Sequence, residues 1–180
     1  MPLKLEETTL RRETVYTGRI VNVRQDLVRL PDGREALREV VEHPGGVAVL
    51  PLTADRHVVL VRQFRYPFGE ILWEIPAGKL EPGEDPAACG LRELREETGY
   101  TADRYEPLGV VYASPGIYGE KLYLFVAREI HYVGDCPDDG EFLNVETRPL
   151  DEVVRMILDG TIKDSKTIAA VLWAREKLKC

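Results

Sequence analysis

The chain has 180 residues and a formal net charge of −7; 31% of its residues are charged and 44% are hydrophobic. A chain of this length suits one domain, or one domain with an extension, and can bury a substantial hydrophobic core. The acidic balance argues against a nucleic-acid-binding surface and gives no reason to expect anionic membranes as partners.

The first residues and the cysteines both favour an intracellular protein. Residues 1–16 lack the apolar segment of a signal peptide, and no apolar run approaches the roughly 18 residues of a membrane span. The three cysteines are odd in number and lack the spacing of a zinc site, which is typical of free thiols. We therefore expect a cytoplasmic location and no membrane contact.

The first half of the chain predicts a series of strands. Alternating and β-branched residues place them at 14–30, 36–43, 47–53, 58–66 and 70–78. The apolar runs in the third and fourth of these are typical of strands buried on both faces. A sharp Pro-Gly-Gly join at 44–46 separates the first strands from the rest. We therefore predict a strand-rich N-terminal region at 1–44 and a main domain at 45–180.

One strong helix is predicted in the middle of the chain. Asp85 is a good N-cap, Pro86 suits the first helical position, and Gly99 suits the stop. The remaining predicted elements are strands at 106–114, 120–129 and 142–150 and helices at 151–160 and 165–179. Together they predict an α/β fold, a mixed sheet with helices packed on it.

The spacing within the central helix separates an apolar stripe from an acidic face. Its apolar stripe consists of Ala87, Leu91, Leu94 and Thr98, and we expect it to face the sheet. Three acids, Glu93, Glu96 and Glu97, fall on roughly the opposite side. On spacing alone, this pattern favours an ordinary solvated face, with a site for a cation as the alternative.

Two further features favour a cation. The loop before the helix, "PAGKLEPG", is rich in glycine and proline and can fix backbone carbonyls in place. A second acidic segment, "DDGE", follows some forty residues downstream. Carboxylates with a backbone carbonyl form an oxygen site suited to Mg²⁺, which would also relieve the repulsion between Glu93 and Glu97.

The same segment resembles the Nudix box, G-x5-E-x7-R-E-U-x-E-E-x-G-U, where U is a bulky apolar residue. Its fixed positions are filled here by Gly78, Glu84, Arg92, Glu93, Leu94, Glu96, Glu97, Gly99 and Tyr100. The chain is therefore similar to Nudix hydrolases. The resemblance implies a Nudix-type α/β/α sandwich and metal-assisted hydrolysis of a nucleoside diphosphate linked to another group.

Segments outside the box resemble the ADP-ribose pyrophosphatase branch of that family. They are "LVRQFRYP", "EIPAG", "ASPG" with Pro115, and "DDGEF", in the same order as in the branch. The resemblance implies hydrolysis of ADP-ribose to AMP and ribose 5-phosphate by a homodimer that exchanges its N-terminal region, residues 1–44. Hydrolysis of other nucleotide sugars, or a catalytically silent nucleotide-binding module, are the alternatives.

The resemblance also implies a metal site and a base. Glu93 and Glu97 correspond to ligands of Mg²⁺, for which Mn²⁺ can substitute, and Glu96 to a further ligand or a water-mediated contact. The backbone carbonyl of Ala77 completes this set. Glu141, in the late acidic loop, corresponds to the catalytic base or to another metal ligand, and a solvated loop acid is its alternative.

One further residue is expected to support the catalytic acids and three to bind the substrate. Arg92 is predicted to orient a box glutamate through a charge-assisted hydrogen bond. Arg65 and Glu74 match substrate-binding positions, with a surface arginine and an edge-strand acid as the alternatives. Arg38 is expected to bind substrate from its place before "EVVEH" alone.

Two departures from the family pattern concern Ile20 and the adjacent residues Cys89 and Gly90. Ile20 stands where the branch often has an aromatic residue that stacks on adenine; possible replacements are Tyr16, Tyr66, Phe68 and Tyr118. Cys89 and Gly90 stand where two alanines are common. Cys89 is expected to be a small buried filler, with an approach to the metal as the alternative. Gly90 is predicted to border the acidic face, away from the core, and to tolerate alanine.

Overall fold

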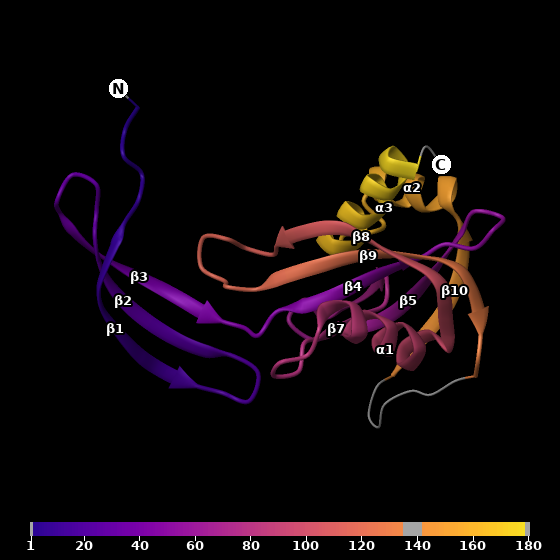
Figure 1. The fold of residues 1–180 in the computed structure, drawn as a ribbon, viewed down its shortest axis with the longest axis horizontal. Helices are drawn as coiled ribbons and strands as arrows, with labels where there is room; N and C mark the ends of the chain where they lie inside the picture. Colours follow the sequence, from indigo (N-terminus) through magenta and orange to yellow (C-terminus); the bar gives the residue numbers. More distant parts are fainter. Residues whose placement is uncertain (1, 135–141, 179–180) are drawn as a thin grey trace. The chain divides into compact units, whose positions relative to one another are not determined.

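In the computed structural model, which describes residues 2–134 and 142–178, the chain divides into two units. One unit contains residues 2–44 and 112–120, and the other contains the remaining described residues. Figure 1 labels the helices and strands of both units.

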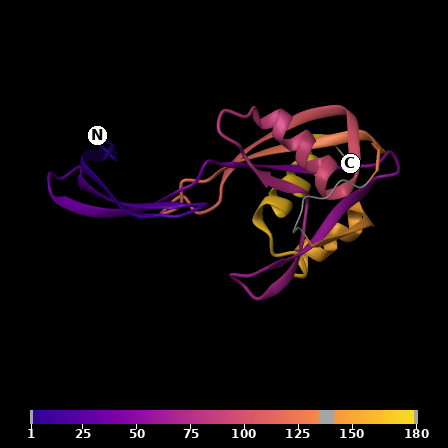
Figure 2. The same ribbon diagram turned by 90° about the horizontal axis from the view of Figure 1, so that it is seen from below.

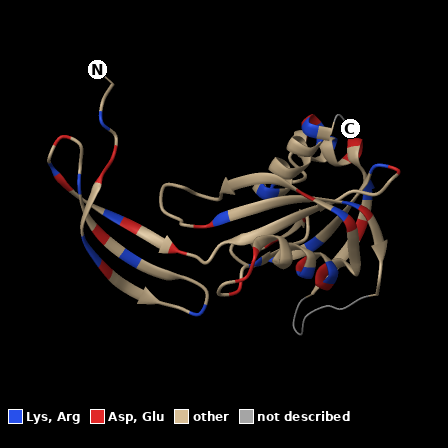
Figure 3. Ribbon diagram, viewed as in Figure 1, with Lys and Arg blue, Asp and Glu red and all other residues tan. Residues whose placement is uncertain are grey.

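The smaller unit is an antiparallel sheet in the order β1-β2-β3. Its strands are β1 (Thr8–Thr17), β2 (Asn22–Arg29) and β3 (Glu35–Glu42). Ion pairs supplement the ladder, since Arg24 binds both Asp26 and Glu42, and Figure 3 shows both signs of charge along these strands. β1 is exposed at every position. Because no residue of β1, β2 or β3 belongs to either hydrophobic core of the described residues, this sheet contributes little to core packing.

The larger unit contains two sheets and three helices. Their orders are β7-β4-β9-β8 and β10-β5-β6, with β4 and β9 parallel and β4–β7, β5–β6 and β10–β5 antiparallel. The strands are β4 (Gly46–Pro51), β5 (His57–Arg65), β6 (Glu70–Glu74), β7 (Ala77–Lys79), β8 (Tyr100–Tyr112), β9 (Lys121–Tyr132) and β10 (Leu143–Pro149). The helices are α1 (Pro86–Thr98), α2 (Leu150–Leu158) and α3 (Ser165–Leu178).

Strand β4 lies between two hydrophobic cores. All six of its residues are buried. Val47 and Val49 pack with Leu94 of α1, while Ala48 and Leu50 belong to the core that includes residues of α2 and α3. Figures 1 and 2 show α1 on one side of the sheet and α3 on the other. This arrangement confirms the predicted α/β/α sandwich and the burial of β4 on both faces.

The ends of α1 follow the sequence signals, but its buried face does not. The Asp85 side chain accepts hydrogen bonds from the N–H groups of Ala87 and Ala88, and Gly99 ends the helix in the left-handed conformation (φ 71°). The buried residues of α1 are Cys89, Gly90, Leu94, Glu97 and Thr98, whereas Ala87 and Leu91 are only half-buried. The helix is therefore rotated from the predicted stripe towards Gly90.

None of the helices formed by the described residues has the length and apolar character needed to span a bilayer.

Candidate active site

The backbone of β7 presents polar groups at the edge of its sheet. In the register of β7 with β4, Ala48 is opposite Ala77, and the neighbouring bond from Val49 N–H to Pro76 O is 2.9 Å. Hydrogen-bonded and non-hydrogen-bonded pairs alternate in an antiparallel ladder, so Ala77 lies in a non-hydrogen-bonded pair. Its N–H and C=O consequently point away from β4. The N–H donates to Oε2 of Glu97 over 2.9 Å, and the carbonyl points off the same open edge.

Glu97 is buried rather than solvated. Only 5% of the residue is exposed, although it belongs to the acidic face that the sequence allowed to be a wet surface. Burial of a carboxylate is costly unless hydrogen bonds or charges compensate it. The bond from Ala77 N–H is one such compensation, and it fixes the Glu97 carboxylate beside β7. The solvated-face alternative is therefore wrong for Glu97.

Glu93 lies directly against the backbone at Gly78. A Cβ atom on Gly78 would be 1.8 Å from Cδ of Glu93, well inside van der Waals contact. A glycine is needed here because it lets the carboxylate approach the main chain of β7. Gly78 and Glu93 are thus in direct contact, which gives a physical reason for a glycine at the first position of the box.

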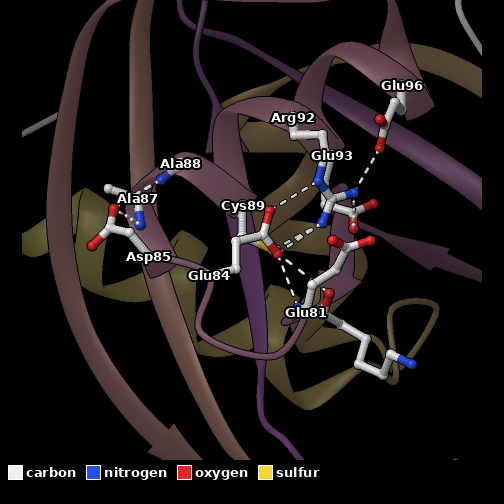
Figure 4. A network of polar contacts seen from close by, with 10 residues as sticks. Glu81, Glu84, Asp85, Ala87, Ala88, Cys89, Arg92, Glu93 and Glu96 are labelled. Carbon is white, nitrogen blue, oxygen red and sulfur yellow. Dashed lines mark hydrogen bonds and ion pairs between the residues drawn. The ribbon is translucent and has the colours of Figure 1, made fainter.

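Arg92 connects three of the box glutamates. Its guanidinium donates to Glu84 through Nε (3.0 Å) and Nη2 (3.1 Å), and its Nη1 donates to Glu93 and Glu96 over 2.8 Å each. Figure 4 shows this network around the Arg92 side chain. The hydrogen bonds from Arg92 and from Glu81 N–H lower the pKa of Glu84 to about 2. The expected role of Arg92 in orienting glutamates matches this geometry.

A cleft of about 520 Å³ opens beside this network. Residues of β7, of the following loop and of α1 line it: Ala77, Gly78, Lys79, Glu81, Arg92 and Glu93. The cleft thus contains one of the two principal predicted metal ligands, Glu93, together with the residue whose carbonyl was predicted to be a third donor. A polar, open cleft of this size suits a charged phosphate ester better than an apolar ligand.

The donor chemistry of the cleft fits a hard cation. Within residues 2–134 and 142–178, no group of three or more histidines, cysteines or acids gathers closely enough to hold a metal ion by itself. Oxygen donors lie beside two successive residues of β7: the Glu93 carboxylate at Gly78, and the Glu97 carboxylate and the free carbonyl edge at Ala77. Mg²⁺ is typically bound by one or two carboxylates and completes its shell with waters and substrate phosphates. The residues present are therefore consistent with Mg²⁺.

Gly90 contradicts its sequence prediction. A Cβ atom at this position would lie 1.9 Å from the hydroxyl oxygen of Tyr105 and 2.8 Å from Cγ1 of Val47. Gly90 therefore packs against the sheet, and this packing leaves no space for the methyl group of the alanine that was predicted to be tolerated. Its neighbour Cys89 is fully buried, and desolvation, with the Glu84 carboxylate nearby, raises the pKa of its thiol to about 12. Cys89 is therefore a small buried residue, as expected.

Arg65 and Glu74 bind each other. Arg65 donates from Nε and Nη2 to the two oxygens of Glu74, over 2.6 Å each. The Glu74 side chain is only 2% exposed, whereas that of Arg65 is 37% exposed. This hydrogen-bonded pair raises the pKa of Arg65, and the charge of Glu97 adds to the effect, so the guanidinium is within electrostatic reach of the box. On the other side Glu74 accepts from Lys166 of α3, a contact that the sequence did not predict.

Of the other expected substrate residues, Arg38, Tyr16 and Tyr118 belong to the smaller unit, whereas Tyr66 and Phe68 are exposed in the larger unit. Arg38 pairs with Glu7 through Nε (3.0 Å) and Nη2 (2.5 Å), and its side chain is 41% exposed. Ile20 and Tyr16 are also exposed. Glu141 lies outside the described residues, so the expected base stays a prediction. A substrate contact by Arg38 requires that its pair with Glu7 open or be shared.

Two family models match the chain. A NUDIX domain matches residues 42–171, and a nucleoside diphosphate sugar hydrolase N-terminal domain matches residues 7–41. The two matches together span most of the chain.

Similar proteins cover nearly the full length. A methanol dehydrogenase activator from Bacillus methanolicus is 42% identical over 178 residues, which are 97% of this chain and 96% of that protein. An ADP-ribose pyrophosphatase from Bacillus subtilis (strain 168) is 38% identical over 175 residues, 96% and 95% of the two chains. A crystal structure of an ADP compounds hydrolase aligns with a TM-score of 0.86 at 24% identity, covering 98% of this chain and 96% of that one. This structural likeness shows the fold.

Proposed function

The chain belongs to the Nudix family, and on that premise we propose that it hydrolyses the pyrophosphate of ADP-ribose to AMP and ribose 5-phosphate. The observation that carries the proposal is the polar cleft lined by Ala77, Gly78 and Glu93. Glu93 lies against Gly78 there, and Ala77 N–H fixes the Glu97 carboxylate next to the cleft. The near full-length similarity to an ADP-ribose pyrophosphatase supports ADP-ribose as the substrate.

The proposed cofactor is Mg²⁺, with Mn²⁺ as a substitute. Glu93, Glu97 and the carbonyl of Ala77 would hold it, and Glu96 would add a direct or water-mediated contact. Held there, a divalent ion would supply neutralisation of the pyrophosphate charge and a coordinated water of lowered pKa. The oxygen donors of the cleft support this assignment.

The side chains of the protein orient the reacting groups. Arg92 holds Glu93 and Glu96 in place and so limits the rotamers open to them. Arg65 keeps N–H groups beyond those bound to Glu74, and its planar fork suits a phosphate oxygen. Because both oxygens of Glu74 are already engaged, we propose that Glu74 acts on the substrate through Arg65. The proton of the attacking water is assigned to Glu141 on sequence grounds alone.

We also propose that two copies exchange their N-terminal regions. β1 is exposed along its whole length, and Val15, Tyr16 and Leu37 leave more than half of their surface in solvent. Apolar surface of this kind is stabilised when a second chain covers it. Light scattering coupled to gel filtration should give twice the 20.4 kDa chain mass; a single chain mass would contradict the exchange. The cytoplasmic location stays a prediction from the sequence.

Hydrolysis of another nucleotide sugar is the alternative that the cleft also accommodates. Purified protein with Mg²⁺ should be given ADP-ribose, GDP-mannose, UDP-glucose and a dinucleoside polyphosphate, with products identified by mass. We expect the highest kcat/KM for ADP-ribose. A higher kcat/KM for another sugar would replace the substrate, and no turnover of any compound would favour a catalytically silent binding module.

A further inference from the structure

A chain of buried charges links Arg65 to helix α3. Glu74 is 2% exposed, and the side chains of Lys166 and Asp164 are 10% and 14% exposed. Lys166 Nζ donates to Oε2 of Glu74 and, over 3.0 Å, to Oδ1 of Asp164. The charges therefore alternate from Arg65 through Glu74 and Lys166 to Asp164, within the larger unit.

The start of α3 is fixed to the end of β6 independently of Lys166. Asp164 accepts hydrogen bonds from the backbone N–H (3.0 Å) and the hydroxyl (2.5 Å) of Thr167, and that hydroxyl accepts from Ile75 N–H over 2.9 Å. These bonds place Lys166 beside Glu74 without using its charge. Removal of the ammonium group should therefore leave the position of α3 largely intact.

Buried charges of this kind are poor stabilisers. Replacement of a buried ion pair by well-packed apolar residues is often neutral or stabilising, because the desolvation of both ions offsets their attraction. Lys166 compensates the buried carboxylates of Glu74 and Asp164, so its removal alone costs stability, but the charge chain as a whole stabilises the fold little. The ammonium group does restrict the Glu74 carboxylate, since Oε2 of Glu74 is held by both Lys166 and Arg65.

The Glu74 carboxylate in turn sets the direction of the Arg65 guanidinium. Both oxygens of Glu74 bind the Nε and Nη2 side of the fork, which leaves Nη1 to face away from Glu74. Arg65 and Glu74 project from the same face of the β5–β6 pair, because Val61 is opposite Glu74 and Arg65 is opposite Glu70. A rotation of Glu74 would therefore turn the part of Arg65 that is open to solvent.

We propose that Lys166 is a positioning residue that, through Glu74, holds the Arg65 guanidinium ready to bind the diphosphate of the substrate. The inference rests on the proposed function, in which Arg65 contacts a substrate phosphate. It predicts that Lys166 affects diphosphate affinity although it contacts no substrate. A merely structural lysine would affect stability alone.

The test is calorimetric binding of ADP, without a divalent ion, to full-length variants whose fold is checked by circular dichroism. ADP carries the diphosphate that all the candidate substrates share. Lys166→Met should weaken ADP binding about tenfold, because the Arg65 guanidinium is then no longer held ready for its charged hydrogen bond to the diphosphate. Lys166→Arg should weaken it less than about threefold, since the charge and the N–H donors remain. Lys163 lies three residues before Lys166 and forms an exposed ion pair with Glu70 of β6. Lys163→Met removes this pair and should leave ADP affinity unchanged.

A double mutant separates positioning from an independent effect. If Lys166 acts through Arg65, Arg65→Met with Lys166→Met should bind ADP no more weakly than Arg65→Met alone. Additive losses would overturn the inference, as would unchanged ADP affinity in folded Lys166→Met. Should Lys166→Met fail to fold, Lys166→Gln keeps a donor to Glu74 without the charge. It should still weaken ADP binding at least about threefold, and wild-type affinity in this variant would overturn the proposal.

The outcome is distinguishable from a failure of the proposed function. If the wild-type protein does not cleave ADP-ribose but the ADP affinities follow the predicted order, the substrate assignment is wrong and the role of Lys166 stands. If ADP-ribose is cleaved and Lys166→Met binds ADP normally, the proposed function stands and the positioning role of Lys166 is wrong.

Discussion

Gly90 of α1 and Tyr105 of β8 fit together so closely that a single methyl group on Gly90 would reach 1.9 Å from the Tyr105 hydroxyl oxygen. The Tyr105 ring stacks on Phe125 at 4.6 Å between centroids, so it has little freedom to move away. Within the described part of the chain, its hydroxyl is buried and has no hydrogen-bond partner. The glycine thus allows the helix that carries the box to lie close to its sheet.

Gly90→Ala should therefore destabilise the protein. Overpacking a core costs about 1–3 kcal/mol, which outweighs the roughly 1 kcal/mol that alanine gains over glycine in a helix. Urea unfolding of the wild type, Gly90→Ala, Tyr105→Phe and the double variant provides the measurement. Tyr105→Phe should cost little and should recover part of the loss in the double variant. A more stable Gly90→Ala protein would refute this packing.

Gly78→Ala should impair activity much more than folding. The atoms that an added Cβ would meet are the end of the Glu93 side chain, which can rotate away, so the melting temperature should hardly change. The displaced carboxylate leaves its place beside β7, and we expect turnover to fall about 100-fold or more. Leu158→Ala is the control, since Leu158 is 78% exposed on α2 and does not line the cleft. Normal turnover by Gly78→Ala would show that the position of Glu93 is not required.

The pair between Glu84 and Arg92 should appear in the pH dependence of stability. Hydrogen bonds from Arg92 and Glu81 N–H lower the pKa of Glu84 from 4.5 to about 2 in the folded protein. As the pH falls, Glu84 is protonated in the unfolded chain before it is protonated in the folded protein. The stabilisation is therefore present above pH 4.5 and is lost as the pH falls towards 2.

Unfolding free energies at a series of pH values between 2 and 7 test this dependence. Glu84→Gln cannot titrate, so its stability should fall less steeply than that of the wild type below pH 4.5. Equal slopes for the two proteins would mean that Glu84 is not held as an anion by Arg92.

The sequence predicted the parts of this molecule that depend on local signals. Asp85, Pro86 and Gly99 mark the ends of α1 because capping depends on neighbouring residues, and the apolar run of β4 reflects burial on both faces. The box also identified the acids that lie beside β7, although their roles in catalysis stay predictions.

Contacts between distant elements could not be predicted in the same way. The helical periodicity of α1 assigned its core face to apolar side chains, yet Gly90 and Glu97 are also buried. Gly90 packs against Tyr105 of β8, and Glu97 accepts a hydrogen bond from Ala77 of β7. Lys166 gave no signal, since its partner Glu74 lies 92 residues earlier in the chain. Such pairs become visible only when the tertiary structure brings the elements together.

The most direct test is a time course of ADP-ribose with the purified wild-type protein and Glu97→Gln, each with Mg²⁺ and with a chelator. The glutamine keeps an oxygen that can accept from Ala77 N–H, so the fold should survive. We predict equal amounts of AMP and ribose 5-phosphate from the wild type with Mg²⁺, and at least about a 1,000-fold slower reaction with Glu97→Gln or the chelator. Unchanged cleavage by Glu97→Gln, or no cleavage by the wild type, would contradict the account.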